Sequence, residues 1–156
     1  FTRLYFKDCY IDGTTDFIFG PSTALFEDCI IHSKRNSYVT AASTPKEAKY
    51  GYVFKHCKLT AEPGVDKVYL GRPWRPYAYT LFIECELGKH IVLAGWHNWG
   101  KQSNEETARY MEYKNTGEGA NASERVAWSK QLTKKEAEAV TVDAIFRTQS
   151  DWNPID

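Results

Sequence analysis

A short strand-like pattern of hydrophobic and polar positions recurs four times in the first part of the chain. Each copy has a Phe three positions before a Cys, a polar or charged residue directly before the Cys, and an aliphatic residue two positions after it. The copies span residues 4–11, 24–31, 52–59 and 80–87, and their cysteines are Cys9, Cys29, Cys57 and Cys85. Because side chains alternate along a strand, each Cys and the aliphatic residue after it face the same side.

The spacing of these copies indicates how the strands are stacked. Successive cysteines lie 20, 28 and 28 residues apart, and self-similarity with a period of about 20–50 residues marks a stacked architecture. The copies carry no amphipathic helix, which excludes the helical repeats, and propeller blades are longer, at about 40–45 residues. We therefore predict an all-β fold, a parallel β-helix with one coil per repeat, in which like residues form ladders about 4.8 Å apart.

The chain is predicted to belong to one domain, 1–156, with three parts. Residues 1–99 hold the coils, and the polar, irregular stretch 100–128 is expected to be a long surface segment that wraps the solenoid. Residues 129–156 are expected to form a tail of short C-terminal helices, because Thr133 and Glu136 match a capping box. Such a tail would shield an open edge of the stacked fold.

Composition narrows the classes of partner. The 20 basic and 20 acidic residues cancel, so charge gives no reason to expect a nucleic acid or an anionic membrane. No segment approaches the roughly 20 apolar residues that span a bilayer. The chain lacks a CxxC motif or a Cys/His cluster, which argues against a zinc site. Stacked coils would bring Cys29 and Cys57 within reach of each other, and both a disulfide and reduced thiols fit the sequence.

Two segments hold the candidate catalytic residues, Asp16 and Arg72. Asp16 lies within the aromatic run 13–20, where a carboxylate is costly unless it has a partner or a chemical task. Coils two or three apart in a β-helix can present residues on one face, and Arg72 beside Asp16 would keep the carboxylate ionised and oriented. Spacing alone favours a structural ion pair over a functional one.

The residues around this pair resemble a known family. Asp16-Phe17-Ile18-Phe19-Gly20 and Leu70-Gly71-Arg72-Pro73-Trp74 resemble two motifs of the pectin methylesterases. Further similarity lies, in order, at Gly95-Trp96-His97-Asn98-Trp99, Tyr110-Met111-Glu112-Tyr113, Arg125-Val126-Ala127-Trp128 and Trp152-Asn153-Pro154. The likeness covers nearly the whole chain, and it favours a functional role for the pair of Asp16 and Arg72.

The resemblance implies a right-handed parallel β-helix that hydrolyses the methyl esters of polygalacturonate. Asp16 would attack the ester carbonyl and form an acyl-enzyme, Arg72 would hold it, and Trp74 would pack on a sugar ring. The substrate-binding residues expected beside them are Phe17, Trp96 and Trp99. In the family a second aspartate and glutamine amides complete the chemistry, and their motifs come before the first block found here. This chain alone is therefore expected to be nearly inactive.

The resemblance also implies no cofactor and no metal, pectin as the partner, a monomer, and a secreted protein of the cell wall, extracellular space or periplasm. A non-catalytic, polysaccharide-binding β-helix is the alternative. A pectate lyase would need clustered acids for calcium, and a polygalacturonase several neighbouring aspartates, and neither cluster is evident in the sequence. His97, beside Trp96, is open to two interpretations, as a border of the sugar groove or as a structural residue.

Overall fold

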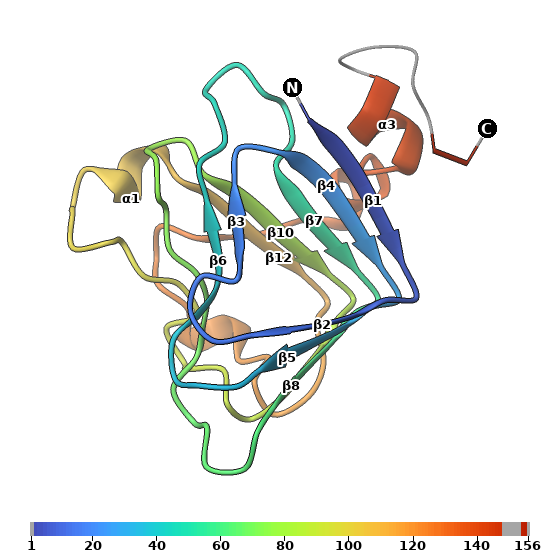
Figure 1. Ribbon diagram of the computed structural model, residues 1–156. Coiled ribbons are helices and arrows are strands. Elements are labelled where there is room, and N and C mark those ends of the chain that lie inside the picture. Colours follow the sequence, from blue (N-terminus) through green and yellow to red (C-terminus); the bar gives the residue numbers. More distant parts are fainter. Residues whose placement is uncertain (1, 148–153, 156) are drawn as a thin grey trace.

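The computed structural model describes residues 2–147 and 154–155, and its chain winds as a right-handed parallel β-helix (Figure 1). The first sheet runs in the order β1 (Arg3–Lys7), β4 (Thr23–Glu27), β7 (Tyr52–Lys55), β10 (Tyr79–Ile83), β12 (Arg109–Tyr113) and β13 (Lys130–Gln131). The second contains β2 (Tyr10–Gly13), β5 (Ile30–Ser33), β8 (Lys58–Ala61) and β11 (Glu86–Leu87). The third contains β3 (Ile18–Gly20), β6 (Tyr38–Ala42) and β9 (Tyr69–Gly71). The predicted fold class is thus confirmed.

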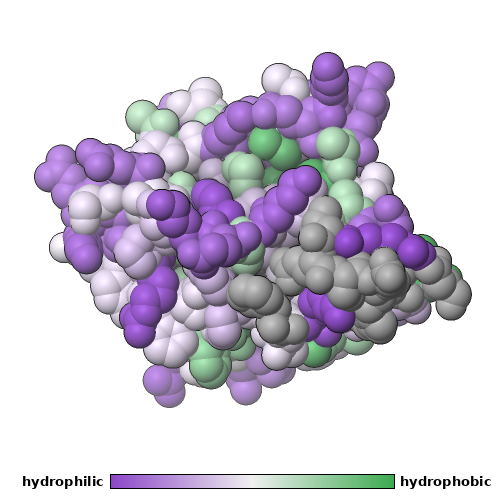
Figure 2. Space-filling view, turned by 90° about the horizontal axis from the view of Figure 1, so that it is seen from above, coloured by the Kyte–Doolittle hydropathy of each residue, from purple (hydrophilic) through white to green (hydrophobic). Residues whose placement is uncertain are grey.

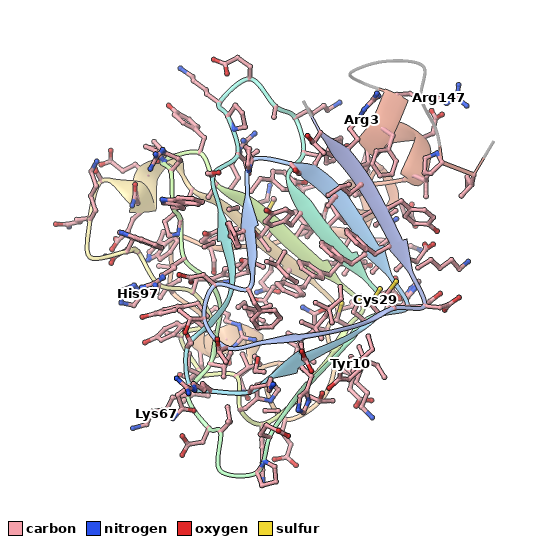
Figure 3. All side chains as sticks on the ribbon, viewed as in Figure 1. Arg3, Tyr10, Cys29, Lys67, His97 and Arg147 are labelled. Carbon is pink, nitrogen blue, oxygen red and sulfur yellow. The ribbon has the colours of Figure 1, made fainter. Side chains whose placement is uncertain are left out.

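The four sequence copies stack in register, as predicted. Their phenylalanines, Phe6, Phe26, Phe54 and Phe82, form a column of parallel rings with centroids 4.9, 4.5 and 4.4 Å apart. Their aliphatic residues, Ile11, Ile31, Leu59 and Leu87, pair in the second sheet. The cysteines are free thiols, so Cys29 and Cys57 are not bridged, and Figure 3 shows sulfur atoms close together where Cys29 lies. Each ladder fills part of the core with stacked side chains of similar shape.

The backbone conformation explains why a polar residue recurs directly before each Cys. Asp8, Asp28, His56 and Glu84 have φ angles of 55°, 54°, 54° and 50°. Each lies at the tight corner between the first and second sheets, where the backbone is left-handed. Asp and His are enriched in this region among residues other than glycine, and branched aliphatic residues are disfavoured there. The recurring polar position is therefore a feature of the corner rather than a sign of chemistry.

The segment 100–128 differs from its prediction as an irregular surface stretch. It contains α1 (Asn104–Thr107) and the 3-10 helix η1 (Ala122–Glu124), but also β12, which pairs with β10 as part of another coil. This coil escaped the repeat pattern because Glu112 takes the register position that Phe82 holds in the preceding coil. A charged residue in the ladder position conceals the repeat from a search for Phe and Cys.

The tail forms the two short helices that were expected, α2 (Lys134–Glu138) and α3 (Val142–Arg147), and Thr133 caps α2 in a complete capping box. Ile145 and Phe146 are buried against residues of the first sheet. Trp152 and Asn153, which were expected to end the domain, lie outside the described residues. Hydrophilic residues cover much of the face seen from above, with hydrophobic residues in small areas between them (Figure 2). No helix in the described ranges is long and apolar enough to cross a membrane.

Candidate active site

Asp16 and Arg72 meet on the third sheet. Asp16 comes just before β3 and Arg72 just after β9, and β6 lies between these strands. Arg72 Nε donates to Asp16 Oδ1 at 3.1 Å, and Arg72 Nη2 donates to Asp16 Oδ2 at 2.7 Å. This bidentate geometry fixes the plane of the carboxylate. The contact expected from the sequence is present, although the two residues lie 56 positions apart.

The backbone of Asp16 is left-handed. Its φ angle is 48°, in the region that Asp enters more readily than most residues with a Cβ. A hydrogen bond from the Asp16 N–H to the carbonyl of Tyr38, at 2.9 Å, holds this conformation. Asp16 thus occupies its position through its main chain and its side chain together, an arrangement often found where a side chain must be aimed.

Two aromatic rings enclose the guanidinium of Arg72. Its Cζ lies 3.9 Å from the centre of the Tyr38 ring and 4.1 Å from that of the Trp99 ring. Burial by itself lowers the pKa of Arg72, but the hydrogen bonds and negative charge of Asp16 outweigh it, so the pKa is raised above its ordinary value. The guanidinium is therefore a permanent cation that contacts two aromatic rings and donates two hydrogen bonds to Asp16.

An aromatic cleft of about 330 Å³ opens beside the pair. It is lined by Thr15, Asp16, Phe19, Ala41, Trp74 and Trp99. Phe19, Trp74 and Trp99 are 63%, 41% and 38% exposed, and the Phe19 and Trp74 rings meet edge to face with centres 5.9 Å apart. Exposed rings around a half-buried carboxylate offer flat apolar surfaces to a ligand that also carries polar groups.

Trp96 was expected in this cleft, and that prediction is wrong. Trp96 is only 1% exposed, stacks on Tyr110 with ring centres 4.3 Å apart, and donates from Nε1 to Glu112 at 3.4 Å. It belongs to the core. Trp96 and Trp99 were grouped because they are close in sequence, but the chain turns between them and only Trp99 reaches the cleft.

Phe17 was also expected to contact substrate, and it lies elsewhere. It is half-buried and packs against the core, in a hollow that it shares with Phe6 and Ile11. Strand β3 begins only at Ile18, so its alternation does not extend back to Phe17. Within β3, Ile18 is buried and Phe19 exposed. That alternation would have selected Phe19, which the sequence interpretation missed.

Tyr38 was missed as well, and no local signal marks it. It lies on the middle strand of the third sheet, in a segment without resemblance to the family motifs quoted above, and only the stacking of coils brings it under Arg72. Among the described residues no group of three or more His, Cys, Asp or Glu is arranged to hold a metal ion. The chemistry that this site offers is that of a fixed carboxylate with one side open to a cleft.

Fold and site together define a parallel β-helix protein whose surface cleft presents a carboxylate among exposed aromatic rings. The chain belongs to the pectinesterase family, because the family model described as Pectinesterase matches residues 1–149. The predicted resemblance is confirmed.

Similar proteins agree in sequence and in structure. Pectinesterase 31 of Arabidopsis thaliana is 45% identical over 136 residues, which are 86% of this chain and 43% of that protein. The pectin methylesterase from carrot superimposes with a TM-score of 0.85 and 34% identity, over 92% of this chain and 50% of that one. A pectin methylesterase in complex with hexasaccharide VII gives a TM-score of 0.80 and 31% identity, over 97% and 52%. The chain thus spans about half the length of these relatives.

Proposed function

We propose that this chain carries the nucleophile and part of the substrate cleft of an enzyme that hydrolyses the methyl esters of pectin. The observation that carries the proposal is the bidentate contact of Asp16 with Arg72 beside the cleft of Phe19, Trp74 and Trp99. Relatives named pectinesterase and pectin methylesterase support this activity.

In the proposed reaction, an oxygen of the Asp16 carboxylate attacks the carbonyl carbon of the C6 methyl ester. The carbon–oxygen bond to the methoxy group then breaks, methanol leaves after protonation, and an acyl-enzyme anhydride remains on Asp16. Water hydrolyses the anhydride and regenerates the carboxylate. A carboxylate is a weak nucleophile, so the contribution of Arg72 is to hold it in the orientation for attack.

Further groups must complete this chemistry. Within the described part of the chain, no second carboxylate and no glutamine lines the cleft. We therefore assign the acid that protonates methoxide, and the amides that stabilise the oxyanion, to the half of the family domain that this chain does not span. The 156-residue chain alone is expected to release methanol far more slowly than a complete enzyme.

The substrate proposed is methylated polygalacturonate. A related pectin methylesterase has been solved with a hexasaccharide, and the exposed rings of Trp74 and Phe19 suit the apolar faces of sugar rings. A secreted protein that acts on cell-wall pectin is consistent with this substrate.

The test is to replace Asp16 by Asn in the full-length protein and to measure methanol release from methylated pectin. We expect a loss of at least about 10³-fold, because nucleophile and charge are removed together. Asp12→Asn is the matched control: Asp12 is exposed on the neighbouring strand β2, and its variant should keep full activity. Methanol release retained by Asp16→Asn would remove Asp16 from the mechanism. A wild-type protein that binds pectin but releases no methanol would instead favour the polysaccharide-binding alternative.

A further inference from the structure

The aromatic enclosure of Arg72 is part of a larger cluster. Tyr38 stacks on Tyr69 of the next strand, with ring centres 5.2 Å apart. His97 meets both tyrosines edge to face, at 5.5 and 5.3 Å. His97 and Tyr69 do not line the cleft, so this cluster lies behind the residues that substrate would touch.

His97 also fixes the backbone of the second ring. The N–H of Trp99 donates to His97 Nδ1 at 3.0 Å, and Trp99 has a φ angle of 64°. A tryptophan in left-handed backbone is strained and needs such a restraint. Because Nδ1 accepts this hydrogen bond, the proton of the neutral imidazole is on Nε2. His97 thus links the tyrosine pair to the indole that covers Arg72.

Tyr38 acts on both members of the ion pair. Its ring lies 3.9 Å from Arg72 Cζ, and its carbonyl accepts the N–H of Asp16 at 2.9 Å. The Trp99 ring also contacts the guanidinium, with its centre 4.1 Å from Cζ, so a change in the orientation of the guanidinium would disturb two ring contacts. The plane of the guanidinium sets the plane of the carboxylate through the bidentate hydrogen bonds.

We propose that Tyr38 and His97 are positioning residues for the ester hydrolysis, acting through Arg72 and Trp99 without touching the substrate. The inference rests on the proposed function. Tyr38 sets the orientation of the Arg72 guanidinium and through it the direction in which Asp16 attacks, whereas His97 sets the position of the Trp99 wall. Small errors in the aim of a nucleophile are costly in rate, so both residues affect catalysis more than stability.

The first experiment compares Tyr38→Leu with Tyr38→Phe in the full-length protein. The Leu variant removes the ring, and we expect kcat to fall about 5- to 30-fold, as for a partly desolvated cation–π contact, with KM within about twofold of wild type. The Phe variant keeps the ring and should recover most of kcat. Wild-type kcat in the Leu variant, or equal losses in the two variants at equal thermal stability, would overturn the role of Tyr38.

The second experiment compares His97→Ala with His97→Asn. An Asn side chain can accept from the N–H two positions later, as Asn98 Oδ1 does from Gly100 N at 2.8 Å. The Ala variant loses the restraint on Trp99, so we expect KM to rise and kcat to fall, each by about 3- to 10-fold, the size of one hydrogen bond. The Asn variant should restore both. Equal behaviour of the two variants would overturn the role of His97.

The outcomes separate this inference from the proposed function. If wild type releases no methanol, or Asp16→Asn releases it normally, the proposed function itself fails. If Asp16→Asn is inactive while Tyr38→Leu and His97→Ala match wild type in kcat, KM and pH profile, only the positioning inference fails.

Discussion

The ion pairs Glu112–Arg125 and Asp16–Arg72 are both bidentate, but they lie in very different surroundings. The side chains of Glu112 and Arg125 are 4% and 2% exposed, whereas those of Asp16 and Arg72 are 20% and 22% exposed. The first pair ends the phenylalanine ladder, and the second lies beside the aromatic cleft. The difference between them separates an ion pair built for structure from one available for chemistry.

The buried pair has its hydrogen-bonding groups occupied. The carboxylate of Glu112 also accepts from Trp96, Asn115 and Gln131. The guanidinium of Arg125 also donates to the carbonyls of Val92, Leu93 and Gly119. A buried charge is tolerated only when it is paired and hydrogen-bonded in this way. No approach is left for a ligand.

In the pair beside the cleft, the hydrogen-bonding capacity of the Asp16 carboxylate is only partly used. Among the described residues, Arg72 is the side chain that donates hydrogen bonds to the Asp16 carboxylate, and rings rather than carbonyls cover the guanidinium. Asp16 also lines the aromatic cleft. A carboxylate that is fixed but incompletely coordinated can act on a ligand, and this contrast supports the proposed role of Asp16.

The largest difference between the two ion pairs should appear when one member of each pair is replaced. Replacing Arg72 by Met in the full-length protein should lower kcat for methanol release by about 10²- to 10³-fold, because Asp16 loses its charge partner and its orientation. Thermal unfolding should change less than on loss of the Glu112–Arg125 pair, because the side chains of Asp16 and Arg72 are more exposed, at 20% and 22% against 4% and 2%. A variant that unfolds early but keeps wild-type kcat would show that Arg72 is structural.

The opposite pattern is expected for Glu112→Gln. Arg125 would be left buried and without a charge partner, which costs about 3–5 kcal/mol of unfolding free energy. Urea unfolding measures this loss, and methanol release per folded molecule should be unchanged. A stable Glu112→Gln protein with impaired kcat would reverse the roles assigned to the two pairs.

Trp74 and Trp96 allow the same comparison between the cleft and the core. Trp74→Ala should raise KM for pectin by about 3- to 10-fold, in line with the loss of one aromatic contact, with no change in melting temperature. Trp96→Ala should lower the melting temperature because it leaves a cavity in the core. Steady-state kinetics and calorimetry on both variants decide this. An unchanged KM in Trp74→Ala would place the sugar chain elsewhere.

The smallest effect is a pH dependence far from the cleft. A hydrogen bond from Lys130, followed by those at Thr133, lowers the pKa of Glu136 from an ordinary 4.5 to about 2. Because the folded pKa is depressed, the stabilisation of α2 by Glu136 is present above pH 4.5 and is lost as the pH falls towards about 2. The melting temperatures of wild type and Glu136→Gln should therefore converge on acidification. Glu138→Gln is the control, and an equal convergence there would contradict the assignment.

How far the sequence predicts the molecule depends on whether a feature repeats. The Phe and Cys ladders come from like residues in successive coils, so their spacing predicted the stacking and the fold. Glu112 broke that repeat, and its coil was missed for this reason. The tail helix was predictable because a capping box is local.

The cleft combines residues that do not repeat, from separate coils. Family motifs marked Asp16, Arg72 and Trp74, whereas Tyr38 carries no local mark. Trp96 was misplaced because nearness to Trp99 in the sequence does not determine whether a ring faces the core or the cleft. Its partners Tyr110 and Glu112 come from a coil that the pattern did not reveal.

Covalent trapping on Asp16 tests the central claim most directly. Full-length protein turning over methylated pectin is treated with borohydride, which reduces an activated acyl group, and the peptide that contains Asp16 is then examined by mass spectrometry. The proposed mechanism predicts conversion of Asp16 to homoserine only while methylated substrate is present, and none with demethylated polygalacturonate. An unmodified Asp16 during active turnover, with the acyl group found on another residue, would contradict it.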